Sequence, residues 1–205
     1  MTYDRLRLFQ AVRLKGRARA EELAAAAGVP MAQTAEILSC LLAAGHVEEA
    51  RDRLKLTSEG RTALEALLTE ERAGVDGAAM VAAYEEFDAH NDRIKGLMTR
   101  WQLKDASTPN DHTDAAYDSR VITDLVALDT GFEPLLARIV GLAPRLGHYP
   151  PRFANALELI MVGDHTWFAR PLADSYHTVW FELHEELIGL CGRTRADEAA
   201  AGRAL

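Results

Sequence analysis

The stretch Pro30–Val47, PMAQTAEILSCLLAAGHV, has the spacing of one helix with an apolar face. Pro30 suits the start of a helix, because its missing N–H would be unpaired there in any case. Gly45 ends the pattern. The stretch contains no Lys and no Arg, and its single charged residue is Glu36. The residues of the expected apolar face are Thr34, Ile37, Leu38, Leu41 and Leu42.

Two further helices are expected before this stretch. Apolar residues recur at helical spacing from Tyr3 to Leu14, and Gly16 ends that pattern. Glu21 and Glu22 then stand in the first turn of a second helix, where the helix dipole favours anions. The sequence GVP at 28–30 stops this second helix, so only three residues separate it from the third.

A hairpin and a fourth helix are expected after the stretch. Two short extended pieces, 47–49 and 54–56, flank the polar tip ARDR at 50–53, which has hairpin length. Thr57 or Ser58 can cap the next helix. The apolar residues of that helix include Leu64, Leu67 and Leu68.

The run from about Leu6 to Leu68 resembles the MarR-type winged helix-turn-helix of bacterial regulators. The matching pieces are AGVPMAQTAEILSCLLAAGHV and LKLTSEGRTAL, and they cover roughly a third of the chain. The resemblance implies that the third helix enters the major groove of DNA and that the hairpin, or wing, touches phosphates. It also implies a homodimer, because half-sites come in pairs.

Candidate DNA contacts follow from that resemblance. Gln33 can pair with an adenine edge, and Thr34 can meet a thymine methyl if it turns outward. Because the third helix has no cation, the phosphate contacts are expected from the wing and from the segment before the second helix. The candidate residues are Arg17, Arg19, Gln33, Thr34, Arg51, Arg53 and Lys55.

The second half of the chain predicts an antiparallel helical bundle. One long helix is expected from about Ala78 to Leu103, followed by the polar, turn-rich segment 104–114. The next helix runs through Val121 to Ile139 with a break near Thr130–Gly131, and Pro144 and the run HYPPR at 148–152 close it. Further helices are expected around 153–161 and 175–190, with a weak one in the tail from Thr194.

Three strings in this half combine His with acids and Trp: NDHTD, GDHTWFARP and SYHTVWFELHEEL. We expect the histidines to meet inside the bundle and to form, with Arg170, a pocket for a small acidic effector. The competing interpretations are hydrogen-bonded core histidines and a buried bridge from Arg170 to Asp164 or Asp174. The candidate ligand-binding residues are His112, His165, Arg170, His177, Trp180 and His184.

A metal site is disfavoured by spacing. His177 and His184 are seven residues apart, which is about 10.5 Å along a helix and too far for one ion to bridge alone. No HExxH, ExxH or CxxC motif is present. No nucleophile–base pair can be assigned either, so we expect neither an enzyme nor a cofactor. The three tryptophans, Trp101, Trp167 and Trp180, are expected in the core.

Charge is distributed unevenly along the chain. The net charge is -8, and residues 1–75 contribute 11 - 11 = 0, so residues 76–205 contribute 12 - 20 = -8. An acidic half repels a duplex, whereas free DNA-binding domains are usually basic. Two cysteines form no disulfide framework, and neither a signal peptide nor a long apolar run is found, so a cytoplasmic protein without membrane contact is expected.

The sequence therefore predicts a mainly α protein. A winged helix-turn-helix domain with a small β-hairpin wing (1–75) precedes a helical bundle (76–205). The leading function is a DNA-binding transcriptional regulator whose bundle dimerises or senses an effector, with double-stranded DNA as partner. The alternative is an interaction module, in which the winged helix no longer binds DNA and instead binds another protein.

Overall fold

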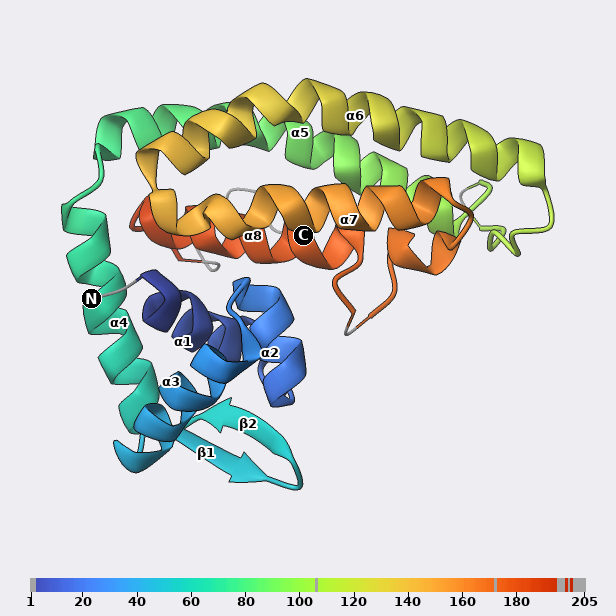
Figure 1. Cartoon of the computed structure of the whole chain (residues 1–205). Helices are drawn as coiled ribbons and strands as arrows, with labels where there is room; N and C mark the ends of the chain where they lie inside the picture. The colour runs from blue at the N-terminus through green and yellow to red at the C-terminus, as the bar shows by residue number, and fades with distance from the viewer. Residues whose placement is uncertain (1–2, 106, 172, 195–197, 199, 201–205) are drawn as a thin grey trace. The chain divides into compact units, whose positions relative to one another are not determined.

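The computed structural model describes residues 3–105, 107–171, 173–194, 198 and 200. The fold is mainly helical with one small antiparallel sheet, in agreement with the predicted class (Figure 1). The chain divides into two compact units. We call residues 1–75 and 143–148 the N-terminal unit, and 76–142 and 149–205 the helical unit.

The N-terminal unit contains the helices and the hairpin expected from the sequence. Its elements are α1 (Tyr3–Lys15), α2 (Ala20–Ala27), α3 (Met31–Ala43), β1 (Val47–Ala50), β2 (Arg53–Leu56) and α4 (Ser58–Ala73). The strands pair in antiparallel register from Val47↔Leu56 to Ala50↔Arg53. The turn therefore comprises only Arg51 and Asp52, which both have positive φ, as a two-residue type I′ turn requires.

Thr57 is the residue that caps α4. Its hydroxyl oxygen accepts a hydrogen bond from the Gly60 backbone N–H at 2.9 Å, which satisfies one N–H of the first turn. The same hydroxyl donates to the Gly45 carbonyl at 2.7 Å. One side chain thus joins the end of α3, the start of the hairpin and the start of α4.

The segment 143–148, within the region predicted as bundle, packs in the N-terminal unit. It contains the 3-10 helix η1 (Pro144–His148). Arg7 Nε donates to the Arg145 carbonyl at 2.6 Å, and the fully buried Arg145 side chain donates to Glu71 at 2.7 Å. Gly28, at φ +63, ends α2 where a Cβ would lie only 3.0 Å from the His148 Cβ. Its lack of a side chain permits both the left-handed backbone and this close approach.

The helical unit consists of α5 (Gly77–Gln102), α6 (Ala115–Leu142), α7 (Tyr149–Met161), the 3-10 helix η2 (His165–Phe168) and α8 (Tyr176–Leu190). α5 and α6 lie side by side, and α8 contacts both α5 and α7 (Figure 1). An aromatic cluster forms the centre of this bundle-like unit, and Trp180 stacks on Phe87 with ring centroids 4.9 Å apart. Trp180 Nε1 donates to Asn91 at 3.2 Å, so its one polar group is paired.

Two boundaries predicted from the sequence are wrong. α6 continues unbroken through Thr130 and Gly131 and also contains Pro134. The run HYPPR does not only end a helix, because α7 begins inside it at Tyr149. Pro150 and Pro151 then occupy the first turn of α7, where a missing N–H removes no hydrogen bond of the helix.

Two other predictions concern single residues or segments. Trp101 and Trp180 are buried as expected, but Trp167 is only half-buried. The tail helix predicted from Thr194 lies mostly outside the described residues. Within the described ranges, no single helix is long and apolar enough to cross a membrane, although α2 and α3 pass that test as a pair bent by 111°.

Candidate functional site

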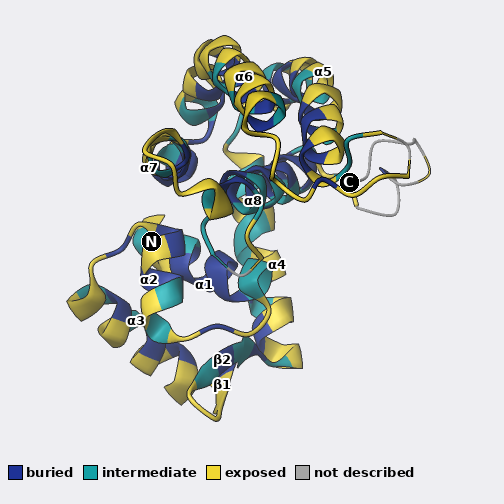
Figure 2. Cartoon of the chain, turned by 90° about the vertical axis from the view of Figure 1, so that its right-hand side faces the viewer, coloured by how far each residue is buried: buried dark blue, intermediate teal, exposed yellow. Residues whose placement is uncertain are grey.

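The outer side of α3 is small, apolar and nearly uncharged. Met31 is 46% exposed and Leu42 is 36% exposed, and Glu36 is the only charged residue of the helix. Exposed residues cover much of α3, whereas α1 is largely buried (Figure 2). The exposed residues of α3 are Met31, Ala32, Ala35, Glu36, Ser39, Cys40, Leu42 and Ala43.

The two residues of α3 that were predicted to read bases are held within the N-terminal unit. Thr34 is fully buried, and its hydroxyl donates to the Val29 carbonyl at 3.3 Å, so it does not turn outward. Gln33 is half-buried, and its Nε2 donates to Asp4 of α1 at 2.9 Å. The prediction that Thr34 meets a thymine methyl is therefore wrong, because this residue packs the core.

Three of the five predicted phosphate-binding cations are paired with carboxylates. Glu22 accepts from Arg19 at 3.0 Å and lies 3.8 Å from Arg53. Glu48 lies 2.5 Å from Lys55 across the hairpin. A hydrogen bond from the Arg19 backbone, together with the nearby cations, lowers the pKa of Glu22. The Lys55 ammonium likewise lowers the pKa of Glu48. The carboxylates of Glu22 and Glu48 are therefore both anionic at neutral pH.

The two other predicted cations, Arg17 and Arg51, are exposed. Arg51 stands in the hairpin turn at φ +54.

A cleft of about 270 Å³ lies between α3 and the hairpin. Apolar and small side chains form most of its wall, and the charged residues among the described ones that line it are Glu49 and Asp52. The lining residues are Ala20, Ala35, Leu38, Ser39, Leu42, Glu49, Asp52 and Leu54. This surface therefore combines apolar contact area with negative charge.

In the helical unit, Trp101 near the end of α5 brings together two of the predicted ligand-binding histidines. The ring centroid of His112 lies 4.4 Å from that of Trp101, and the His165 ring meets the same indole edge-on at 6.0 Å. Phe168 of η2 stacks on Trp101 at 4.3 Å. The strings NDHTD and GDHTWFARP therefore meet at one end of the helical unit.

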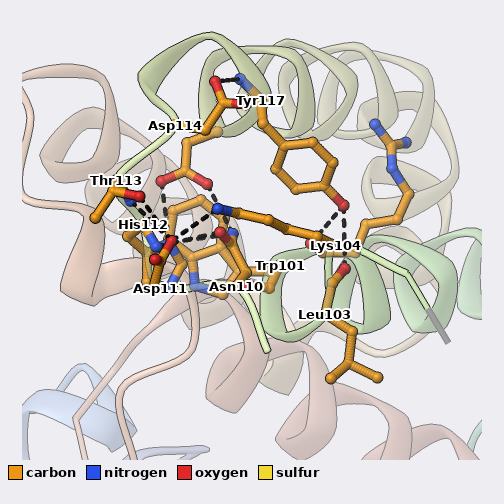
Figure 3. A network of polar contacts seen from close by, with 11 residues as sticks. Trp101, Leu103, Lys104, Asn110, Asp111, His112, Thr113, Asp114 and Tyr117 are labelled. Carbon is orange, nitrogen blue, oxygen red and sulfur yellow. Dashed lines mark hydrogen bonds and ion pairs between the residues drawn. The ribbon is translucent and has the colours of Figure 1, made fainter. Parts of the chain in front are cut away.

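A polar network holds His112 at this position (Figure 3). Its Nδ1 lies 3.0 Å from the Oδ2 of Asp118, whose Oδ1 accepts from Asn110 at 2.8 Å. The backbone of His112 has φ +58, and its N–H donates to the Asn110 side chain at 3.1 Å. Lys104 closes the loop 104–114 by donating to Asp111 at 2.7 Å. The imidazole is therefore oriented by a carboxylate, as in a His–Asp pair.

His184 belongs to a different group of residues. It is fully buried, and its Nε2 lies 3.0 Å from the hydroxyl of Tyr84, which donates to Glu198 at 2.7 Å. Tyr84 and Trp101 are 17 residues apart on α5, which corresponds to about 25 Å of helix. The four histidines therefore do not share one pocket, and that prediction is wrong. Helical spacing predicts on which face of its own helix a histidine lies, but it does not predict which part of the neighbouring helix that histidine contacts.

Arg170 does not form the predicted buried bridge. It is exposed, whereas Arg152 of α7 is buried and grips Asp174 with two hydrogen bonds of 2.9 and 3.0 Å. Arg152 also donates to the buried Glu182 at 2.6 Å. A sequence signal for Arg152 existed, since it lies four and eight residues before Ala156 and Ile160, on the buried face of α7.

His177 provides a prediction on pH. Burial in the first turn of α8 lowers its pKa below the ordinary value of 6.5. The unfolded chain then binds the proton more tightly than the folded chain, so this residue reduces stability as the pH falls below about 6.5. We expect His177→Gln to make urea unfolding less sensitive to pH between 7 and 5. His165→Gln, at an exposed position, is the control and should retain the wild-type dependence.

No group of three or more His, Cys, Asp or Glu side chains within the described part of the chain could hold a metal ion. Comparison of the chain with models of protein families, with curated proteins and with solved structures found no match.

Proposed function

We propose that the N-terminal unit is a winged helix that binds another protein through α3 and the hairpin, rather than a reader of DNA. The element order α1, α2, α3, β1, β2, α4 supports the winged-helix interpretation. A further support is the isolated antiparallel β-bridge between Ala18 and Leu54, through which the segment before α2 pairs with the hairpin.

This proposal is carried by the charge balance of α2, α3 and the hairpin, the face that the winged-helix resemblance assigns to DNA. Residues 17–56, which include α2, α3 and the hairpin, hold five Lys/Arg and six Asp/Glu, so their net charge is 5 - 6 = -1. Affinity for duplex DNA depends on cations that displace the counterions of phosphates. A face with no cation on α3 and with Arg19, Arg53 and Lys55 near carboxylates offers little of that attraction.

The cleft between α3 and the hairpin indicates the chemistry of the partner. Its wall is apolar, and Glu49 and Asp52 contribute negative charge. A partner segment that places an apolar side chain in the cleft and a basic residue beside these carboxylates would satisfy both features. Charge complementarity of this kind governs specificity and association rate more than affinity.

Site-specific photo-crosslinking in the source cell tests this proposal. A photoreactive residue at Ser39, which lines the cleft, should yield a defined protein adduct. The same residue at the exposed Ser119 of α6 is the control and should not yield that adduct. The double variant Glu49→Lys/Asp52→Lys should lose the Ser39 adduct. Persistence of that adduct in the charge-reversed variant would contradict the proposed partner chemistry.

DNA-dependent regulation remains the second candidate, because Arg17 and Arg51 are exposed and a cation at a wing tip can approach a groove. We expect no salt-sensitive binding of a labelled random-sequence duplex by the wild type, measured by fluorescence anisotropy down to about 20 mM salt. Glu36→Arg combined with Glu49→Lys should introduce measurable binding, which provides a positive control on the same fold. Wild-type affinity that falls steeply with salt and is weakened by Arg51→Ala would instead establish the regulator.

The small acidic effector is not part of this proposal, since the histidines that would form its pocket lie in separate groups along α5. Homodimerisation stays a prediction from the resemblance alone.

A further inference from the structure

A cleft of about 410 Å³ lies between α6 and α7 of the helical unit. This volume falls within the range of small-molecule sites, which are mostly apolar with a few placed polar groups. The described residues that line the cleft are apolar apart from two carboxylates, Asp129 and Glu133, and none of them is Lys, Arg or His. The lining residues are Asp129, Phe132, Glu133, Leu136, Ala137, Pro150, Pro151, Phe153 and Ala154.

Asp129 is held in a fixed orientation at this cleft. The fully buried Tyr176 of α8 donates its hydroxyl proton to Oδ1 of Asp129 at 2.8 Å. Phe153 packs against the Tyr176 ring with centroids 5.1 Å apart, and this contact fixes the tyrosine from the side of α7. Within the described ranges, no protein donor contacts the other oxygen, Oδ2. One acceptor of a positioned carboxylate is therefore available.

Among the residues that the structure describes, no ion pair is formed by Asp129 or by Glu133. Burial raises the pKa of Asp129 and the neighbouring Glu133 carboxylate adds to this effect, whereas the Tyr176 hydrogen bond opposes it. Glu133 stands four residues later, on the same side of α6. Arg152 of α7, which is close in sequence to the lining residues Pro151 and Phe153, already donates hydrogen bonds to Asp174 and Glu182. Arg138 on α6 pairs with Glu86 of α5.

We infer that this cleft binds a small organic amine, whose ammonium group lies between Asp129 and Glu133 and whose apolar body packs on Phe132, Leu136 and the two prolines. An ammonium donates to Oδ2 of Asp129 and neutralises the negative charge that the cleft concentrates. An anionic ligand would meet two carboxylates at this site. This inference is independent of the partner proposed for α3, because every lining residue belongs to the helical unit.

Calorimetric titration of the full-length protein tests this site with matched probes. The amines are 2-phenylethylamine, cyclohexylmethylamine and hexylamine, and the controls for the first are 2-phenylethanol and phenylacetate, which keep the apolar body and change the charge. We expect at least one amine to bind at millimolar concentration or below. 2-Phenylethanol should bind at least about tenfold more weakly than its amine, as expected for loss of a charge-assisted hydrogen bond.

Variants assign the binding to the cleft. Asp129→Asn keeps an acceptor for Tyr176 but removes the charge, and it should weaken amine binding at least about tenfold. Tyr176→Phe keeps the charge but releases the carboxylate from its hydrogen bond, so it should weaken amine binding less than Asp129→Asn does. Glu158→Gln removes an exposed carboxylate of α7 and should change nothing.

Three results would overturn the inference. These are no binding by any of the three amines, equal affinity for 2-phenylethylamine and 2-phenylethanol, and unchanged amine affinity in a folded Asp129→Asn protein. Near-wild-type thermal unfolding of Asp129→Asn verifies that loss of binding is not loss of fold. If amine binding is absent while Tyr176→Phe destabilises the protein, Asp129 serves only to tie α6 to α8.

Discussion

Replacement of Arg152 by methionine is expected to lower the free energy of unfolding by about 3–5 kcal/mol, the usual cost of removing one partner of a buried ion pair. Arg152 holds two acidic groups at once, with hydrogen bonds of 2.9 and 3.0 Å to Asp174 and 2.6 Å to Glu182. Its guanidinium also lies 5.2 Å from the Tyr149 ring centroid. Methionine would fill a similar volume but leave both carboxylates without this cation.

Urea denaturation followed by Trp fluorescence measures this effect, because Trp180 is fully buried in the same unit. Arg170→Met is the matched control, since it removes an exposed arginine from the neighbouring segment and should change stability by no more than about 0.5 kcal/mol. Equal effects of the two substitutions would show that the network contributes nothing to stability.

The contrast between Arg152 and Arg170 shows that the partner of a buried acid on another helix could not be predicted from the sequence. One interpretation of the sequence was a buried bridge from Arg170 to Asp164 or Asp174. The structure leaves Arg170 exposed, and Asp174 instead pairs with Arg152. The actual partner comes from a different helix, and helical periodicity alone does not determine which residues of two helices lie opposite each other.

Local signals were reliable where one segment determines its own structure. The cap at Thr57, the end of α2 at Gly28 and the hairpin between Val47 and Leu56 all agree with the sequence. The break expected in α6 is absent, because a glycine inside a helix costs only about 1 kcal/mol. Gly131 has open space around it, and the packing of the buried residues on either side can offset that cost. The predicted meeting of the four histidines was wrong because their mutual distance depends on how α6, η2 and α8 pack against α5.

Gly60 lies in the first turn of α4, within the piece LKLTSEGRTAL. Gly60→Ala is expected to destabilise the protein by at least about 1–3 kcal/mol. A Cβ at this position would lie 1.8 Å from the His46 carbonyl oxygen and 2.8 Å from the carbonyl carbon. That carbonyl accepts from the Thr57 backbone N–H at 3.1 Å, so it cannot turn away without losing a hydrogen bond. Relief of the clash therefore has to separate the start of α4 from the start of β1.

Gly131→Ala in α6 gives a control of opposite sign. A Cβ at Gly131 would meet nothing within 4 Å, and the residue lies in the interior of an α-helix. Alanine there should stabilise the protein by about 0.5–1 kcal/mol, because it reduces the conformational freedom of the unfolded chain. Thermal and urea unfolding of both variants measure the two changes. If Gly60→Ala were as mild as Gly131→Ala, the close approach of α4 to the His46 carbonyl would not constrain the N-terminal unit. A severe effect confined to Gly60 would instead make this contact the feature that fixes the hairpin beside α4, and with it the cleft between the hairpin and α3.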